Sequence, residues 1–84
     1  MLIQYVKHNG EYVGTVVALD KDQIGWSQCC PRDKFNKNRG VTIAAGRALV
    51  GTKKTPANTT GLAIHRTIVK MSERAEKYFK QKED

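Results

Sequence analysis

The chain has 84 residues and a net charge of +7, with 39% hydrophobic and 27% charged residues. A chain of this length forms one domain, which we expect to span residues 1–84, with a modest core that often gains stability by association. The longest uncharged apolar run is far shorter than the roughly 20 residues of a membrane span, so no membrane helix is expected. The N-terminal residues lack the apolar segment of a signal peptide, and the adjacent Cys29 and Cys30 favour free thiols in a reducing cytoplasm.

Residues 1–30 are expected to form an antiparallel β-meander. The segments LIQYVKH and EYVGTVVAL are rich in β-branched and aromatic residues, which favours strands. Asn9-Gly10 lies between them and supplies the two positive-φ positions of a type I′ hairpin turn. Asp20-Lys21-Asp22 predicts a second turn, and QIGWSQCC predicts a third strand that ends at Pro31.

Residues 31–51 are expected to form a basic turn followed by a short helix. Pro31 favours a helical turn directly after the third strand. Gly40 is expected to separate that turn from a helix over residues 41–50. Phe35, the large apolar side chain of the turn, is expected to anchor it in the core.

Residues 59–82 predict a long helix. Its apolar residues advance by four and three positions, which is a heptad-like stripe, and the stripe consists of Ile64, Ile68, Met71, Ala75 and Tyr78. We expect one face of the sheet to pack against both helices. The fold class is then α+β, a three-stranded antiparallel sheet followed by two helices, the last one long. The same stripe fits a second copy of the chain, so a homo-oligomer is expected as well.

The positive charge is concentrated between residues 31 and 54, where seven Lys or Arg residues accompany one Asp. A concentrated cationic segment attracts anions, among them nucleic acid, a phosphorylated small molecule or an acidic protein surface. The glycines at 40, 46 and 51 do not have the spacing of a phosphate-binding Walker loop or of a dinucleotide fingerprint. An anionic partner is therefore expected without a nucleotide-hydrolysing motif.

The sequence contains no catalytic or metal-binding pattern. The acidic residues are few and scattered, and His8 and His65 do not have the spacing of metal ligands. Cys29 or Cys30 acting with His65 as nucleophile and base stays open as an alternative. We expect a protein that is not an enzyme and that carries no metal and no cofactor.

Arg47 is the leading candidate for ligand binding. It lies in the middle of the predicted helix among the small residues Ala44, Ala45 and Ala48, where a cation requires a partner. A guanidinium is a planar fork of donors that suits a phosphate or a carboxylate. We therefore expect Arg47 to contact such a group, and its removal to abolish ligand binding with little change in stability. An intramolecular salt bridge and a side chain that reaches solvent are the alternatives.

The other candidate ligand-binding residues are either cations in or beyond the basic segment or aromatic residues that can stack on a nucleobase. They are Trp26, Arg32, Phe35, Lys37, Arg39 and Arg66. In this interpretation the cations around Phe35 form a basic lip, and Arg66 extends it from the last helix. A solvated loop and, for Trp26, the core of the sheet are the alternatives.

Residues 24–51, IGWSQCCPRDKFNKNRGVTIAAGRALVG, resemble a pattern of small phage-encoded proteins. The pattern is a strand that ends in Cys, a Pro-x-Asp-x-Phe-Asn-Lys step, a Gly, and Ile-Ala-x-Gly-Arg-Ala. A small sheet followed by two helices is similar to the Thoeris anti-defence sponges. The resemblance implies an oligomeric protein in the cytoplasm of an infected bacterial host. Such a protein sequesters a cyclic ADP-ribose-type or cyclic oligonucleotide signal without catalysis.

The resemblance does not place that family's ligand contacts on this chain, so the candidate residues rest on charge and residue size. The expected partner is a phosphorylated nucleotide-type small molecule. The alternative is a small basic phage protein that binds nucleic acid or a host regulatory protein. Binding that weakens steeply with salt would favour nucleic acid.

Overall fold

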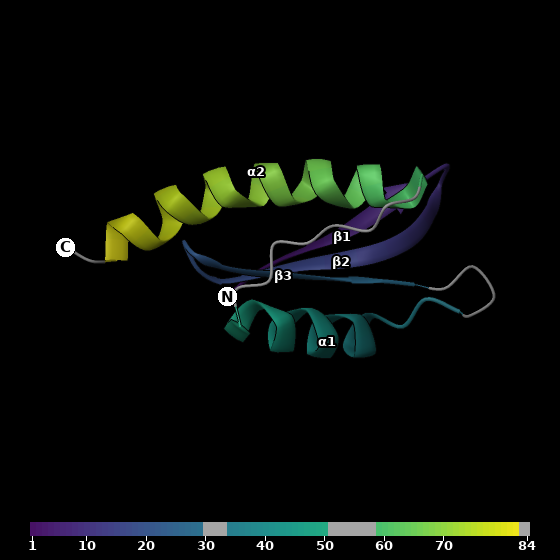
Figure 1. Cartoon of the computed structure of the whole chain (residues 1–84), viewed down its shortest axis with the longest axis horizontal. Helices are drawn as coiled ribbons and strands as arrows, with labels where there is room; N and C mark the ends of the chain where they lie inside the picture. Colours follow the sequence, from purple (N-terminus) through teal and green to yellow (C-terminus); the bar gives the residue numbers. More distant parts are fainter. Residues whose placement is uncertain (30–33, 51–58, 83–84) are drawn as a thin grey trace.

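The computed structural model describes residues 1–29, 34–50 and 59–82, and in the last range it describes the side chains from 63 to 79. Its elements are β1 (Leu2–His8), β2 (Glu11–Asp20), β3 (Gln23–Gln28), α1 (Lys37–Val50) and α2 (Thr59–Lys82). The strands form one antiparallel sheet in the order β1-β2-β3. The expected α+β class, a three-stranded sheet followed by two helices of which the last is long, is confirmed (Figure 1).

The β1–β2 hairpin turns at Asn9 and Gly10, as the sequence predicts. Both residues have positive φ, 53° and 82°, which is the backbone of a type I′ turn. The register of the two strands shifts between Val6 and Lys7, and Lys7 then pairs with Tyr12. Such a bulge increases the local twist of the strands. The turn and the bulge together decide which side chains meet at this end of the sheet.

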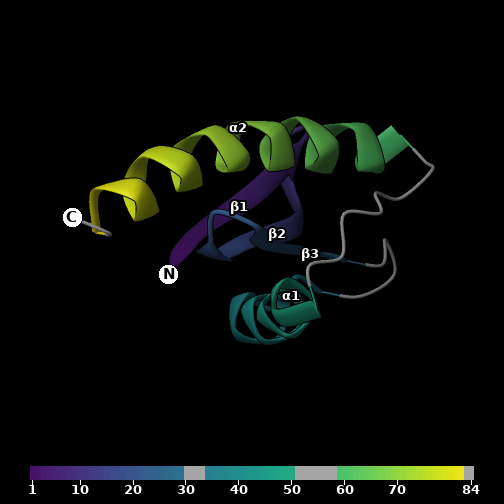
Figure 2. The ribbon, with the colours of Figure 1, turned by 60° about the vertical axis from the view of Figure 1, so that its left-hand side comes forward.

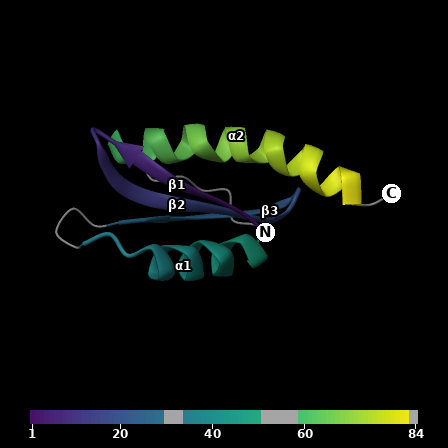
Figure 3. The ribbon, with the colours of Figure 1, turned by 180° about the vertical axis from the view of Figure 1, so that it is seen from behind.

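The two helices cover opposite faces of the sheet (Figure 1), and the view from behind shows the same three layers (Figure 3). The expectation that one sheet face packs against both helices is therefore wrong. The cause is the central strand, in which all residues from 14 to 18 are buried. A strand with one solvated face would alternate between buried and exposed residues, whereas β2 buries side chains in both directions.

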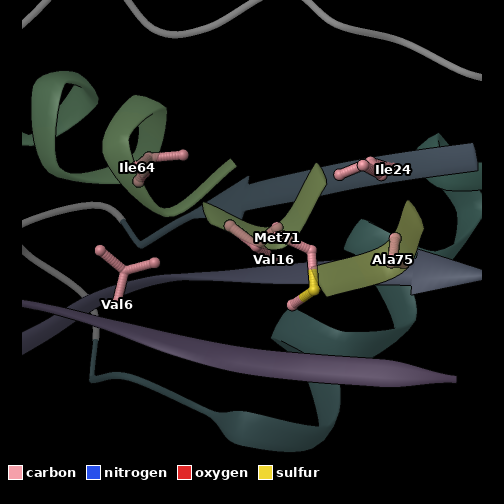
Figure 4. Close-up of a cluster of buried hydrophobic side chains, with 7 residues drawn as sticks. Val6, Val16, Ile24, Ile64, Met71 and Ala75 are labelled. Atoms are coloured by element: carbon pink, nitrogen blue, oxygen red, sulfur yellow. The ribbon is translucent and has the colours of Figure 1, made fainter. Parts of the chain in front are cut away.

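The main hydrophobic core lies between α2 and the sheet (Figure 4). It is formed by Val6, Val16, Ala18 and Ile24 from the strands and by Ile64, Met71 and Ala75 from α2. The three helix residues belong to the heptad-like stripe, whose Tyr78 remains 39% exposed. The chain's own sheet therefore occupies most of the stripe. The homo-oligomer stays a prediction, and its interface would have to use a surface other than this stripe.

Helix α1 packs against β2 and β3 through small residues, on the face away from α2 (Figure 2). Gly40, Ala44 and Ala48 are its buried residues, and their spacing of four places them in one row. A Cβ atom at Gly25 of β3 would overlap the main chain of α1 at Ala44 and Ala48. A Cβ atom at Gly40 would lie 2.6 Å from Thr15 Oγ1. The small residues therefore bring the backbones of helix and sheet into contact.

Helix α1 begins at Lys37 rather than near Val41. Asn36 is its N-cap, because the Asn36 Oδ1 accepts a hydrogen bond from the Arg39 N–H at 3.0 Å. The Asn36 carbonyl accepts the first helical hydrogen bond, from the Gly40 N–H at 2.9 Å. Gly40 therefore lies inside the helix and does not separate two elements, since its role is the close approach to the sheet.

Candidate functional site

The first turn of α1 carries positive charge and no acidic residue. Lys37 and Arg39 lie in this turn, Lys34 precedes it, and all three side chains are exposed. The N-terminus of a helix is already the positive end of the helix dipole, so a cation there costs about 0.3–1 kcal/mol. The arrangement is unfavourable for the helix alone and favourable for a bound anion.

A pocket of about 490 Å³ opens beside this turn. Its wall combines Ser27 and Cys29 at the end of β3 with Lys34, Phe35 and Arg39 around the start of α1. The pocket thus has a polar wall with two cations and one aromatic edge. Its volume is in the range that holds a small organic ligand.

Three aromatic rings pack beside the pocket and form the aromatic cluster: Tyr5 of β1, Tyr12 of β2 and Phe35. Tyr12 and Phe35 are stacked, with 5.3 Å between ring centroids, and Tyr5 meets both rings edge-on at 6.2 and 6.1 Å. The Lys37 Nζ lies 5.0 Å from the Tyr5 centroid, and the Lys7 Nζ lies 4.8 Å from the Tyr12 centroid. The cluster is therefore both aromatic and positively charged, an arrangement that cation–π attraction stabilises.

The aromatic cluster occupies the part of the sheet that α1 leaves uncovered, since α1 packs mainly against β2 and β3. Tyr5 shares a sheet face with its cross-strand partner Thr15, which lies under α1. Tyr12 is 38% exposed. Phe35 is half-buried and lies here rather than in the main core, contrary to the expectation for this residue. Because Phe35 also lines the pocket, the pocket and the cluster form one surface.

Arg47 lies beside β3, an edge strand of the described sheet, and does not line the pocket. Its Nη1 donates a hydrogen bond to the Trp26 carbonyl at 2.9 Å, and its Cζ lies 4.7 Å from the Trp26 ring centroid. The Cys29 N–H donates to the Val13 carbonyl of β2. Since main-chain groups alternate in direction along an antiparallel strand, the Trp26 carbonyl points away from β2. Arg47 therefore connects α1 to the Trp26 carbonyl and indole ring, and its expected contact with a phosphate or a carboxylate stays a prediction.

Arg66 is exposed on α2, on the other side of the sheet from α1. It borders a shallow groove of about 780 Å³ that runs along β1 and includes Lys7 and Tyr12. Arg66 is therefore separated from the pocket by the width of the aromatic cluster. Arg32 lies outside the described residues, and its assignment stays a prediction.

The structure brings three of the candidate residues together, namely Phe35, Lys37 and Arg39. Sequence reasoning missed Tyr12, which belongs to the aromatic cluster, and Lys7, whose Nζ lies over the Tyr12 ring. A signal for them was present, because a two-residue turn places the residues on its two sides opposite one another. With Asn9-Gly10 as the turn, the side chains of positions 7 and 12 meet across the hairpin.

Among the described residues, no three His, Cys, Asp or Glu side chains gather as a metal site requires. Neither helix, in the part of the chain that the structure describes, has the length and apolar composition to cross a membrane. Comparison with protein-family models, curated proteins and solved structures finds no match. The pocket, the aromatic cluster and their charges are therefore the features of this chain that bear on its function.

Proposed function

We propose that this protein binds a nucleotide-type anion in the pocket beside α1 and catalyses no reaction on it. The observation that carries the proposal is the pairing of Lys34 and Arg39 around a pocket at the positive end of a helix. Helix N-termini bind phosphate through main-chain N–H groups and through the helix dipole. The N–H groups of Lys37 and Asn38 have no acceptor within the helix, because they belong to its first turn.

A nucleotide matches this pocket better than a small inorganic anion does. The volume of about 490 Å³ exceeds the space that a phosphate group fills by itself. Phe35 adds an aromatic edge against which a base can pack, and the neighbouring Tyr12 continues that surface. The charges then account for the phosphate, and the rings account for the base.

The side chains around the pocket support binding without chemistry. The described residues of its wall include no carboxylate and no imidazole, the groups that most often act as general acid or base. The Ser27 hydroxyl is buried and donates a hydrogen bond to the Gly40 carbonyl at 3.0 Å, so it serves to hold α1 on β3. His65, the alternative base for Cys29, belongs to α2 and does not line this pocket.

The resemblance of residues 24–51 to the Thoeris anti-defence sponges supports a biological role for this binding. We propose that the protein is a phage anti-defence protein in the cytoplasm of an infected bacterial host. It holds a cyclic ADP-ribose-type or cyclic oligonucleotide signal and keeps it from its receptor. Sequestration requires tight binding without turnover, and homo-oligomerisation belongs to the same proposal.

Isothermal titration calorimetry of the full chain tests the proposal. The panel contains inorganic phosphate, a mononucleotide, a cyclic dinucleotide, cyclic ADP-ribose and a DNA duplex. We expect a nucleotide-type ligand to bind at a fixed stoichiometry and inorganic phosphate to bind far more weakly. If no nucleotide binds at any concentration up to the millimolar range, the proposal is wrong.

Two variants and a matched control locate the site. Arg39→Gln and Lys34→Gln should each weaken nucleotide binding by about tenfold or more, the contribution of one charge-assisted hydrogen bond. Lys21→Gln makes the same change in charge in the exposed turn between β2 and β3, at the far end of the sheet. It should leave the affinity unchanged. An equal loss in all three variants would mean that only net charge attracts the ligand.

A further inference from the structure

The pocket, the aromatic cluster and the groove along β1 are continuous. Phe35 belongs to both the pocket and the cluster. Tyr5 and Tyr12 belong to both the cluster and the groove. The surface therefore starts beside α1 and continues over the aromatic cluster to the groove along β1, which Arg66 of α2 also lines.

Five cations border this surface: Lys7, Lys34, Lys37, Arg39 and Arg66. The described residues that line the pocket and the groove include no carboxylate. Glu11, on the hairpin, lines neither of them. A continuous cationic path of this kind follows a chain of phosphates better than it surrounds one compact anion.

We infer that this surface is a binding track for single-stranded nucleic acid, with bases against the aromatic cluster and phosphates along the five cations. The inference rests on the proposed function, because one nucleotide of the strand occupies the pocket beside α1. Proteins that bind single strands combine a cationic groove with rings on which successive bases stack. Here Tyr12, 38% exposed, stacks on Phe35 and has the Lys7 Nζ over its ring at 4.8 Å from the centroid, so a base stacks on this ring in place of the Lys7 ammonium.

A single strand fits this surface better than a duplex or an acidic protein segment does. The bases of a duplex stack on one another and do not reach rings that lie on a sheet. An acidic segment would pair with the cations but would leave Tyr5, Tyr12 and Phe35 without a matching flat group. The experiment below therefore includes a duplex and an acidic peptide as competing ligands.

Fluorescence anisotropy with 5′-fluorescein-labelled oligothymidylates of two, four and eight nucleotides tests the track. Unlabelled dTMP is measured as a competitor of the labelled strands. We expect the affinity to rise with length, by about 100-fold or more from dTMP to the eight-nucleotide strand, since each stacked base adds about five- to 100-fold. The logarithm of the binding constant should fall with the logarithm of salt concentration with a slope of about −3.5, the value for five phosphate contacts of a single strand.

Variants separate a binding role of the rings from a structural one. Tyr12→Leu keeps an apolar side chain and removes the ring, so it should weaken the eight-nucleotide strand by about five- to 100-fold and weaken dTMP by a smaller factor. Lys7→Gln should reduce the salt slope by about 0.7. Arg66→Gln should act on the eight-nucleotide strand only, and Lys21→Gln should act on none. Circular dichroism melting of each variant monitors folding.

The outcomes distinguish this inference from the proposed function. If the eight-nucleotide strand binds no more tightly than dTMP, the track is wrong and the pocket stands. If dTMP and every strand fail to bind, the track is wrong, and the proposed function is wrong as well when the cyclic nucleotides of the calorimetric panel also fail to bind. Equal binding of an eight-base-pair duplex or of a polyglutamate peptide would overturn the track, because neither presents stacked bases to the rings. A Tyr12→Leu variant that melts earlier yet binds the strand as the wild type does would show that the rings are structural.

Discussion

Replacing Arg39 with Glu is expected to stabilise the unliganded protein and to abolish anion binding. Position 39 is the third residue of α1, and its N–H bonds to the Asn36 side chain at 3.0 Å. A cation there opposes the positive helix end and a carboxylate complements it, each by about 0.3–1 kcal/mol. The exchange should therefore raise the free energy of unfolding by about 1 kcal/mol. For a chain of this size, that corresponds to about 4–8 °C in melting temperature.

The same exchange removes one of the two cations in the pocket wall and places a negative charge beside Lys34 and the ligand phosphate. The loss of one charge-assisted hydrogen bond accounts for about 1.5–3 kcal/mol of binding free energy. Repulsion between the new carboxylate and the phosphate adds to this loss. Binding of the nucleotide should therefore weaken by more than about 100-fold.

Thermal melting followed by circular dichroism measures the first effect, and calorimetric titration with the nucleotide measures the second. The stabilisation should shrink in 1 M NaCl, where the Debye length is only about 3 Å. Arg74→Glu makes the same charge change at an exposed position in the middle of α2 and should alter neither quantity by much. A lower melting temperature for Arg39→Glu would refute the dipole argument. A stabilised variant that still binds would show that the site lies elsewhere.

Three further predictions concern packing. Gly25→Ala should cost about 3 kcal/mol or prevent folding, because its Cβ would overlap the main chain of α1, whereas Gly46→Ala, with nothing within 4 Å, should stabilise α1 by about 0.5–1 kcal/mol in urea denaturation. Arg47→Ala should lower the free energy of unfolding by about 1–2 kcal/mol, because a hydrogen bond and a ring contact are lost, and should leave nucleotide affinity unchanged. Lost nucleotide binding with unchanged stability would instead support Arg47 as a ligand-binding residue. Met71→Ala should cost about 2–5 kcal/mol in chemical denaturation, and Val69→Ala, at a side chain 46% exposed, under about 0.5 kcal/mol. An equal loss of stability in Met71→Ala and Val69→Ala would contradict the packing of α2 on the sheet.

The features that the sequence predicted well are local. Asn9-Gly10 adopts its positive-φ turn because the backbone preference of two residues decides it. The long helix follows from an apolar stripe that spans residues 64–78, a period that repeats along the chain itself. The concentration of cations near α1 is likewise a property of composition and needs no tertiary information.

The start of α1 was predicted incorrectly, and the sequence did not show the contacts of Arg47 with Trp26. The cap at Asn36 is also local, but Gly40 was given the role of a separator when its lack of a Cβ serves packing against Thr15. Arg47 lies among small residues in the sequence, so a phosphate or carboxylate partner was expected, and that expectation stays a prediction. In the structure Ala44 and Ala48 face the sheet, and Arg47 reaches over the edge of β3 to Trp26.

The sequence by itself determined the strands and helices, the hairpin turn, and the sign and place of the excess charge. Only the tertiary structure decided that α1 and α2 take opposite faces and that Tyr5 and Tyr12 meet Phe35 beside Lys37. The physical reason is the range of the interactions. Propensity, capping and turn geometry act within a few residues, so the local sequence determines them. The face that a helix covers depends on how much apolar surface β2 has to bury on each side, which is settled by all the strands and helices together.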